Sequence, residues 1–207
     1  MQKRLVRKRD LEIQLSKVEP HPSPKAHLEQ YTIPVDTAAE ILYLAAYTFN
    51  DIVDKKVADL GCGTGRFAIG AALLGASEVI AIDIDKVAVE TAKRNAEELN
   101  VKDKIHLIIG DVEALIGKFD TVLQNPPFGV QRRRADRKFL SKALEIGRHI
   151  YSLHKAGSSE FIKRFIEKHG GKITGIFPFE IWIPHTFPFH TKPKHSVKVE
   201  LYRIEGK

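Results

Sequence analysis

The sequence is poor in the residues that build cross-linked, cysteine-bound or membrane-spanning proteins. It has one cysteine, Cys62, among 207 residues, which excludes an internal disulfide and a cysteine-rich zinc site. Apolar runs stay well below the roughly 18 residues that a membrane helix needs. The charged start, MQKRLVRKR, lacks the apolar segment of a secretory signal. We therefore expect an intracellular, cytoplasmic protein.

Acidic residues are outnumbered by basic ones, and the formal net charge is +7. Six of these seven net charges fall between residues 128 and 155, where eight Lys and Arg stand against two acids. A basic excess permits a polyanionic partner such as a nucleic acid but does not identify one. A solvated basic surface without any partner is the alternative.

Hydrophobic residues make up 43% of the chain and alternate between strand and helix patterns, which predicts an α/β protein. We expect a Rossmann-like, doubly wound, mostly parallel seven-stranded sheet with an antiparallel C-terminal hairpin. One structural domain is expected, with an N-terminal helical segment over residues 1–50 and an α/β domain over residues 51–207. The patterns place helices over 3–18, 36–49, 66–74, 86–99, 137–153 and 158–168, and strands over 56–60, 78–82, 105–109, 121–123, 172–177 and 197–204.

A glycine-rich turn follows the first strand. It runs from Asp59 to Gly65 with the spacing G-x-G-x-G, and glycines let the backbone turn tightly and approach a ligand. Two more acids, Asp83 and Asp111, follow the next two strands. Because open α/β sheets bind ligands at the carboxyl ends of their strands, these acids predict a binding site there. A structural turn with loop acids is the alternative, and the spacing does not fit the dinucleotide fingerprint G-x-G-x-x-G.

This turn with its acids resembles motif I of class I S-adenosylmethionine-dependent methyltransferases, which implies S-adenosyl-L-methionine as the cofactor. The resemblance places Asp59 near the methionine amino group, Asp83 on the ribose, and Asp111 with Val112 beside the adenine. It also implies that the turn lines the cofactor through Gly61, Gly63, Thr64, Gly65 and Arg66.

The fourth strand ends in the tetrapeptide Asn125-Pro126-Pro127-Phe128. Two prolines fix two φ angles, so the Pro126 carbonyl is held rigidly beside the Asn125 side-chain acceptor. Two acceptors that bind the two hydrogens of an exocyclic amine can free its delocalised lone pair for attack on a methyl group. Phe128 offers a flat face for a base, and the chemistry needs positioning and hydrogen bonding rather than a metal.

The tetrapeptide resembles motif IV of amino-methyltransferases, which act on adenine N6, cytosine N4 or a glutamine side-chain amide. A proline-stiffened structural turn is the alternative. Phe at the fourth position is commonest in adenine N6 enzymes, whereas the glutamine-directed members more often have Tyr. Cys62 is disfavoured as a nucleophile for carbon methylation, because it lies inside the cofactor turn.

Basic side chains around this loop suit an RNA backbone. Three nearby histidines, His185, His190 and His195, do not predict a metal site, since no Cys or nearby carboxylate accompanies them. The residues that we expect to contact RNA are Arg132, Arg133, Arg134, Arg137, Lys138, Lys155, Lys192 and Lys194.

Nearly the whole chain resembles the methyltransferase-like protein 5 family. The resemblance rests on the glycine turn and the Asn-Pro-Pro-Phe tetrapeptide together with Leu28–Tyr31, Tyr151–Lys155 and Lys194–Val197. It implies methylation of adenine N6 in small-subunit ribosomal RNA, with residues 1–50 as a cofactor lid in which Gln30, Tyr31 and Thr32 lie over the cofactor. Two alternatives remain, a release-factor-type protein glutamine N5 methyltransferase and a non-catalytic, RNA-binding ribosome-assembly protein.

The third strand, residues 105–109, is expected at one edge of the sheet. Edge strands usually contain Lys, Pro or a bulge that blocks pairing, and this one has none. Helices covering both faces would explain the apolar side chains, but not what satisfies the open backbone edge. The family resemblance implies a partner, a Trm112-type zinc-binding activator protein that would pair along residues 105–109 by strand addition.

Overall fold

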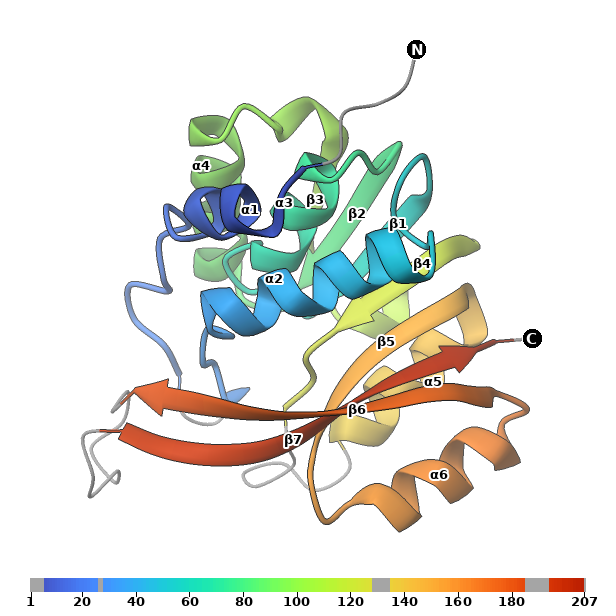
Figure 1. Cartoon of the computed structure of the whole chain (residues 1–207). Helices are drawn as coiled ribbons and strands as arrows, with labels where there is room; N and C mark the ends of the chain where they lie inside the picture. The colour runs from blue at the N-terminus through green and yellow to red at the C-terminus, as the bar shows by residue number, and fades with distance from the viewer. Residues whose placement is uncertain (1–5, 26–27, 128–134, 185–193, 207) are drawn as a thin grey trace.

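The computed structural model describes residues 6–25, 28–127, 135–184 and 194–206 (Figure 1). A seven-stranded sheet runs through the molecule in the order β3-β2-β1-β4-β5-β7-β6. The first five strands are parallel, and β7 is antiparallel to both β5 and β6, which confirms the predicted fold class. The strands are β1 Lys56–Leu60, β2 Glu78–Asp83, β3 Ile105–Ile109, β4 Phe119–Gln124, β5 Gly147–Lys155, β6 Lys172–Pro184 and β7 Lys194–Glu205.

Helices cover both faces of the sheet and enclose two hydrophobic cores. One core lies between the sheet and α1 to α4, and the other between the sheet and α5 and α6. No helix in the described parts of the chain is long and apolar enough to cross a bilayer. The helices are α1 Lys8–Leu15, α2 Val35–Tyr43 with a π-helical extension Leu44–Thr48, α3 Arg66–Leu73, α4 Lys86–Glu98, α5 Ala135–Ile146 and α6 Ser159–Lys168.

The helix predicted over residues 137–153 is wrong beyond Ile146, where the chain begins strand β5. This strand lies between β4 and β7, and helices cover both its faces, so neither face shows the alternation of a half-exposed strand. A Cβ on Gly147 would lie 2.6 Å from Val122, which leaves room only for glycine where the helix gives way to the strand. The last two strands are also longer than predicted, and α1 ends three residues earlier than predicted.

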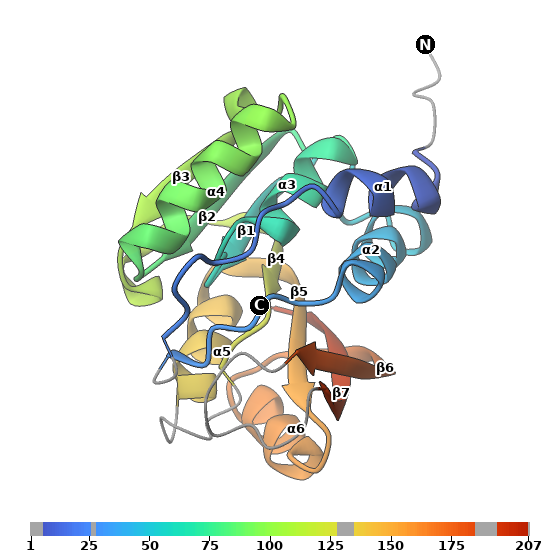
Figure 2. The same cartoon turned by 90° about the vertical axis from the view of Figure 1, so that its left-hand side faces the viewer.

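Helix α1 packs against α2 and α3, and the chain that follows it crosses the carboxyl edge of the sheet (Figure 2). Leu11 and Leu15 of α1 are fully buried in the core with α2 and α3. The chain between α1 and α2 then runs in front of the carboxyl ends of the parallel strands (Figure 2). We call residues 18–25 and 28–34 of this crossing segment the strap.

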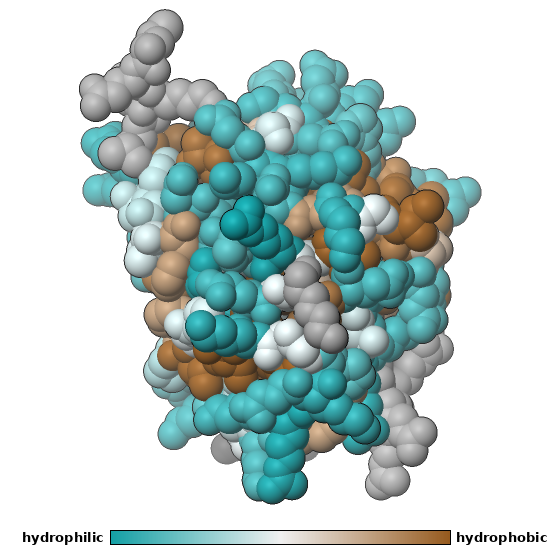
Figure 3. Space-filling model, turned by 90° about the vertical axis from the view of Figure 1, so that its right-hand side faces the viewer, coloured by the Kyte–Doolittle hydropathy of each residue, from teal (hydrophilic) through white to brown (hydrophobic). Residues whose placement is uncertain are grey.

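The opposite side of the molecule is mostly hydrophilic, with scattered apolar patches (Figure 3).

Candidate functional site

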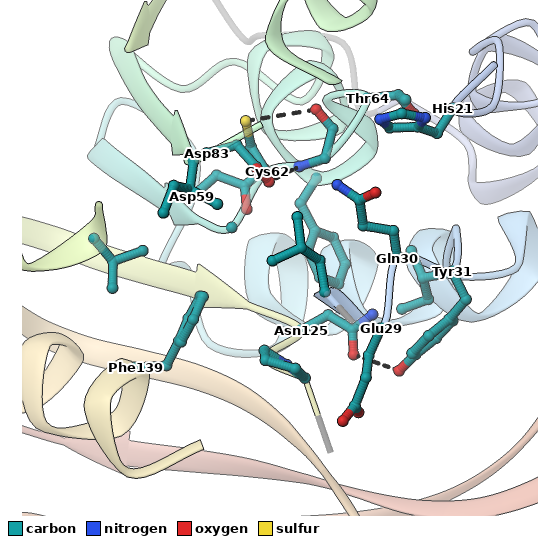
Figure 4. A pocket seen from close by; sticks show the side chains of 18 of the residues that line it. His21, Glu29, Gln30, Tyr31, Asp59, Cys62, Thr64, Asp83, Asn125 and Phe139 are labelled. Carbon is teal, nitrogen blue, oxygen red and sulfur yellow. Dashed lines mark hydrogen bonds between the residues drawn. The ribbon is translucent and has the colours of Figure 1, made fainter. Parts of the chain in front are cut away.

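A pocket lies at the carboxyl edge of the sheet, under the strap (Figure 4). It brings together six separate parts of the sequence: the strap, the glycine turn, the loop after β2, the loop after β3, the end of β4, and α5. Its lining residues are His21, Leu28, Glu29, Gln30, Tyr31, Thr32, Ile33, Asp59, Gly61, Cys62, Gly63, Thr64, Arg66, Phe67, Asp83, Ile84, Gly110, Asp111, Val112, Asn125, Pro127, Lys138 and Phe139.

The glycine turn forms the floor of this pocket. The backbone N–H groups of Gly61 and Cys62 both donate to the carbonyl of Ile82, at 2.9 and 3.0 Å, which ties the turn to β2. Gly65 has a φ of 90°, a left-handed conformation that favours glycine, and it caps α3. A Cβ on Gly61 would lie 2.7 Å from the Phe139 ring, so a side chain there would displace the aromatic wall of the pocket.

Two buried acids lie side by side near this turn. Asp59 accepts a hydrogen bond from the backbone N–H of Ala68 at 2.9 Å, and burial raises its pKa to about 7. Asp83 accepts from the N–H groups of Gly63 and Asp85 at 2.8 and 2.9 Å, one on each carboxylate oxygen. Each of these oxygens can accept a further bond, so Asp83 can bind a pair of hydroxyl groups.

The third predicted acid, Asp111, is paired with a lysine of α5. Lys138 contacts Asp111 directly and lies 3.0 Å from the Glu113 carboxylate. Burial opposes the charge on Lys138, but the two acids raise its pKa, so it is a cation inside the pocket. The sequence predicts Lys138 among the RNA-contacting residues, whereas its ion pairs tie it to the adenine end of the predicted cofactor site.

The Asp85 carboxylate binds three side chains of the strap and so holds the strap against the pocket. Gln30 donates to its carboxylate at 2.8 Å, while Lys25 and His21 each have a nitrogen 3.2 Å from it. Because the Asp85 backbone N–H also donates to Asp83, the strap is linked through one residue to the predicted ribose acid.

Arg66, the first residue of α3, also holds the strap. Its guanidinium donates to the carbonyl of Ile33 and, at 3.3 Å, to that of Val18. The Nε atom is buried and has no hydrogen-bond partner among the described residues. Burial lowers the Arg66 pKa to about 10, so the charge is retained at neutral pH without being fully satisfied.

Asn125 stands at the mouth of the pocket, directly after β4. The Tyr31 hydroxyl donates to its Oδ1 at 2.8 Å (Figure 4). Pro126 is buried and Pro127 lines the pocket. Phe128, the last residue of the predicted tetrapeptide, lies outside the described residues.

A buried polar chain supports the strand behind Asn125. The Gln124 amide donates to the Ser152 hydroxyl at 2.8 Å, and that oxygen lies 2.6 Å from His154 Nε2. The Ser152 hydroxyl therefore joins the Gln124 amide to the His154 ring. Burial lowers the His154 pKa to about 4, which keeps this ring neutral.

The basic cluster predicted from the sequence is more dispersed in space. Arg137 is exposed and stacks 4.5 Å over the Phe161 ring, and Lys155 is exposed at the end of β5. Lys142 is buried against Glu145 at 2.8 Å, and Arg148 lies at the opposite, amino end of β5. Lys194 begins β7. Arg132, Arg133, Arg134 and Lys192 lie outside the described residues.

The predicted cofactor residues all line the one pocket except Gly65, which shapes the turn without facing the cavity. Sequence reasoning missed His21, Ile84 and Phe139. The position of Ile84 directly after Asp83 could have indicated that it lines the same pocket. Phe139 had no such signal in the sequence, since its position depends on how α5 packs against the glycine turn.

Comparison with known proteins identifies the family. Residues 33–151 match the methyltransferase small domain family. The rRNA N(6)-adenosine-methyltransferase METTL5 of Danio rerio is 35% identical over 95% of this chain and 97% of its own. The uncharacterized protein MJ0284 of Methanocaldococcus jannaschii is 44% identical over 97% of this chain and 95% of its own. The crystal structure of Pyrococcus horikoshii PH1948 has a TM-score of 0.90 at 44% identity and covers 98% of this chain and 99% of that one.

Proposed function

Because the chain belongs to the methyltransferase small domain family and, within it, to the METTL5 family, we propose that it methylates the N6 amine of an adenine in small-subunit ribosomal RNA. It is a methyltransferase that uses S-adenosyl-L-methionine. The observation that supports the substrate most strongly is the position of Asn125, whose side chain borders the pocket that also contains Asp59 and Asp83.

The pocket fits the cofactor chemically. S-adenosyl-L-methionine has an α-ammonium, an α-carboxylate, a ribose diol and an adenine. Asp59 would bind the ammonium, and the buried, incompletely satisfied Arg66 guanidinium would attract the carboxylate. The free acceptor positions of Asp83 match the diol. Ile84, Val112 and Phe139 offer apolar surface to the adenine.

The cofactor, when bound, supplies a methyl group on a positively charged sulfur. The residues of this chain would bind the target adenine and orient its N6 amine towards that methyl group. The Asn125 side-chain oxygen and the Pro126 carbonyl would accept the two N6 hydrogens, and Phe128 would stack on the base. This pair of acceptors favours a nitrogen whose lone pair is available, and the polar groups are already fixed before the substrate arrives.

RNA adenine is favoured over a protein glutamine by two observations. The relatives named as rRNA adenosine methyltransferases match along almost the full length of both chains. The exposed Arg137 and Lys155 also add positive charge on the helix that follows the catalytic loop and on the strand beside it.

The test uses ribosomal RNA from a strain of the source organism that lacks the gene. Mass spectrometry of its nucleosides should show less N6-methyladenosine than the parent strain, and the gene should restore it. An unchanged N6-methyladenosine content, with a missing methyl group on a release-factor glutamine, would support the glutamine alternative instead.

We also propose that a Trm112-type zinc-binding activator pairs with β3. This strand is at the sheet edge and pairs only with β2 among the described strands. Ile108 and Ile109 are 37% and 52% exposed, so covering helices do not account for their apolar side chains. Strand addition would satisfy the open backbone edge and cover both residues.

Co-expression with such an activator from the same organism tests this pairing. Ile109→Lys should reduce co-purification, whereas Ile116→Lys, the same change at an 82% exposed site, should not. Leu107 is a poorer probe, because it packs against the core. A wild-type chain that is fully active alone and never co-purifies would contradict the partner.

A further inference from the structure

The Tyr31 hydroxyl and the Asn125 side chain meet across 94 residues of sequence. Tyr31 comes from the strap and Asn125 from the end of β4, and both line the pocket (Figure 4). The resemblance of the sequence to its family places Tyr31 over the cofactor. Its hydroxyl, however, points at the residue that would hold the target amine, 2.8 Å from Oδ1.

The hydrogen bond runs from the Tyr31 hydroxyl to the Asn125 carboxamide oxygen. Burial raises the pKa of Tyr31 further above neutral, so the hydroxyl keeps its proton and remains able to donate it. The acceptor on Asn125 is its carboxamide oxygen. A carboxamide can turn by half a revolution, which exchanges this acceptor for an NH₂ donor. A phenol is a better donor than acceptor, because its oxygen lone pair is delocalised into the ring. The contact with Tyr31 therefore favours the orientation in which the carboxamide oxygen accepts from Tyr31.

This bond does not use up the acceptor. A carboxamide oxygen has two lone pairs, and Tyr31 occupies one of them. The second remains for a donor from the substrate, which an N6 amine provides. An amide turned the other way would instead present N–H groups to N–H groups, and the amine would not bind.

Residues of the strap on both sides of Tyr31 in the sequence make contacts that hold it in place. Its neighbour Gln30 donates to Asp85 at 2.8 Å, and Ile33 accepts from Arg66. Asp85 in turn donates its backbone N–H to Asp83. The same segment that closes over the cofactor pocket therefore fixes the hydroxyl that orients Asn125.

We infer that Tyr31 is a positioning residue for methyl transfer: it orients the Asn125 carboxamide and links that orientation to the strap over the cofactor. The inference rests on the proposed function, since it assigns Asn125 to the target amine. It differs from a role in holding the cofactor, which would act on cofactor affinity.

The first experiment needs no substrate. The Asn125 side-chain amide gives a ¹⁵N–¹H signal that is assigned by its loss in Asn125→Ala. Tyr31→Phe keeps the ring and removes the hydroxyl, and it should shift this signal. Tyr43→Phe, at a partly buried tyrosine packed edge-on against Tyr47, should leave it in place. A signal that Tyr31→Phe does not move would overturn the inference.

The second experiment separates positioning from binding. Tyr31→Phe should lower kcat by roughly five- to tenfold, as for one ordinary hydrogen bond, with cofactor Kd and RNA KM within about threefold. In an Asn125→Ala background the same change should cost less than about twofold, because Tyr31 acts through Asn125. An equal loss in both backgrounds, or a kcat that rises, would contradict the inference. If wild-type protein makes no N6-methyladenosine, the proposed substrate fails, while the side-chain signal still decides the Tyr31 contact.

Discussion

The backbone N–H of Gly63 donates to the Asp83 carboxylate at 2.8 Å, which joins the glycine turn to the end of the neighbouring strand. The two residues are 20 positions apart. Through this bond the turn orients the acid before any ligand arrives. The acid also accepts from the Asp85 N–H, so its position is fixed from both sides.

Asp83→Ala should weaken cofactor binding by about 10- to 100-fold, because one hydrogen bond to a charged group contributes roughly 1.5–3 kcal/mol. Calorimetry with S-adenosylhomocysteine measures this directly. Asp103→Ala, at an exposed acid before β3, is the matched control and should bind like wild type. Unchanged affinity in Asp83→Ala would remove Asp83 from the site.

Asn125→Ala should separate binding from chemistry. The side chain is directed at the target amine, so cofactor affinity should stay within a few-fold of wild type. Methyl transfer should fall by at least ~100-fold, as for loss of one preorganised polar group. Single-turnover transfer of a labelled methyl group measures this, and near-normal transfer would show that the proposed acceptor pair is wrong.

Cofactor binding should weaken in mild acid because of Asp59. Burial raises its pKa to about 7 in the free protein, and pairing with the cofactor ammonium requires the ionised form. The ammonium, with an ordinary pKa near 7.7–8.0, stays charged below pH 7. Affinity should therefore fall roughly tenfold between pH 7 and pH 5.5. Calorimetry across this range should show the slope in wild type and a flat profile in Asp59→Asn, and equal slopes would exclude Asp59 as the titrating group.

His154 should make folding stability depend on pH. Its pKa is lowered to about 4 in the folded protein, against about 6.5 unfolded, so between these values only the unfolded chain binds the proton. Stability present above pH 6.5 is thus lost as pH falls towards 4. From pH 7.5 to pH 5.0 the loss should be about 2 kcal/mol. Urea unfolding should show this extra loss in wild type but not in His154→Gln, and parallel curves would contradict it.

Arg132, Arg133 and Arg134 remain a prediction from the sequence. Replacing all three by Ala should weaken RNA binding and flatten its salt dependence, by roughly 0.7–0.9 in log–log slope for each phosphate that the variant no longer binds. Arg148→Ala is the control, because Arg148 lies at the amino end of β5, away from the pocket. An unaltered slope in the triple variant would mark these arginines as a solvated surface.

The sequence predicts the part of the fold that local patterns determine. The strand Lys56–Leu60, the glycine turn and the helix from Arg66 lie where the spacing places them, because glycines and flanking apolar runs act within a few residues. For most of β5 the local pattern predicts a helix instead. The conformation of this strand depends on pairing with β4 and β7, which no local pattern reveals.

The site residues also divide into those that local sequence patterns predict and those that depend on tertiary packing. Asp83 ends β2 and Asn125 directly follows β4, so both can be found from the sequence, although their roles remain proposals. Lys138 beside Asp111, and the Tyr31 hydroxyl on Asn125, arise from packing between segments 27 and 94 residues apart. Residue type and spacing contain no signal for such contacts.

We propose that this chain methylates adenine N6 through Asn125. The most direct measurement incubates wild-type and Asn125→Ala protein with S-adenosylmethionine and small-subunit ribosomal RNA from a strain lacking the gene. Nucleosides are then analysed by mass spectrometry. We predict N6-methyladenosine with wild type and at least ~100-fold less with the variant. Methylation at another atom, or equal amounts of N6-methyladenosine from both proteins, would contradict the account.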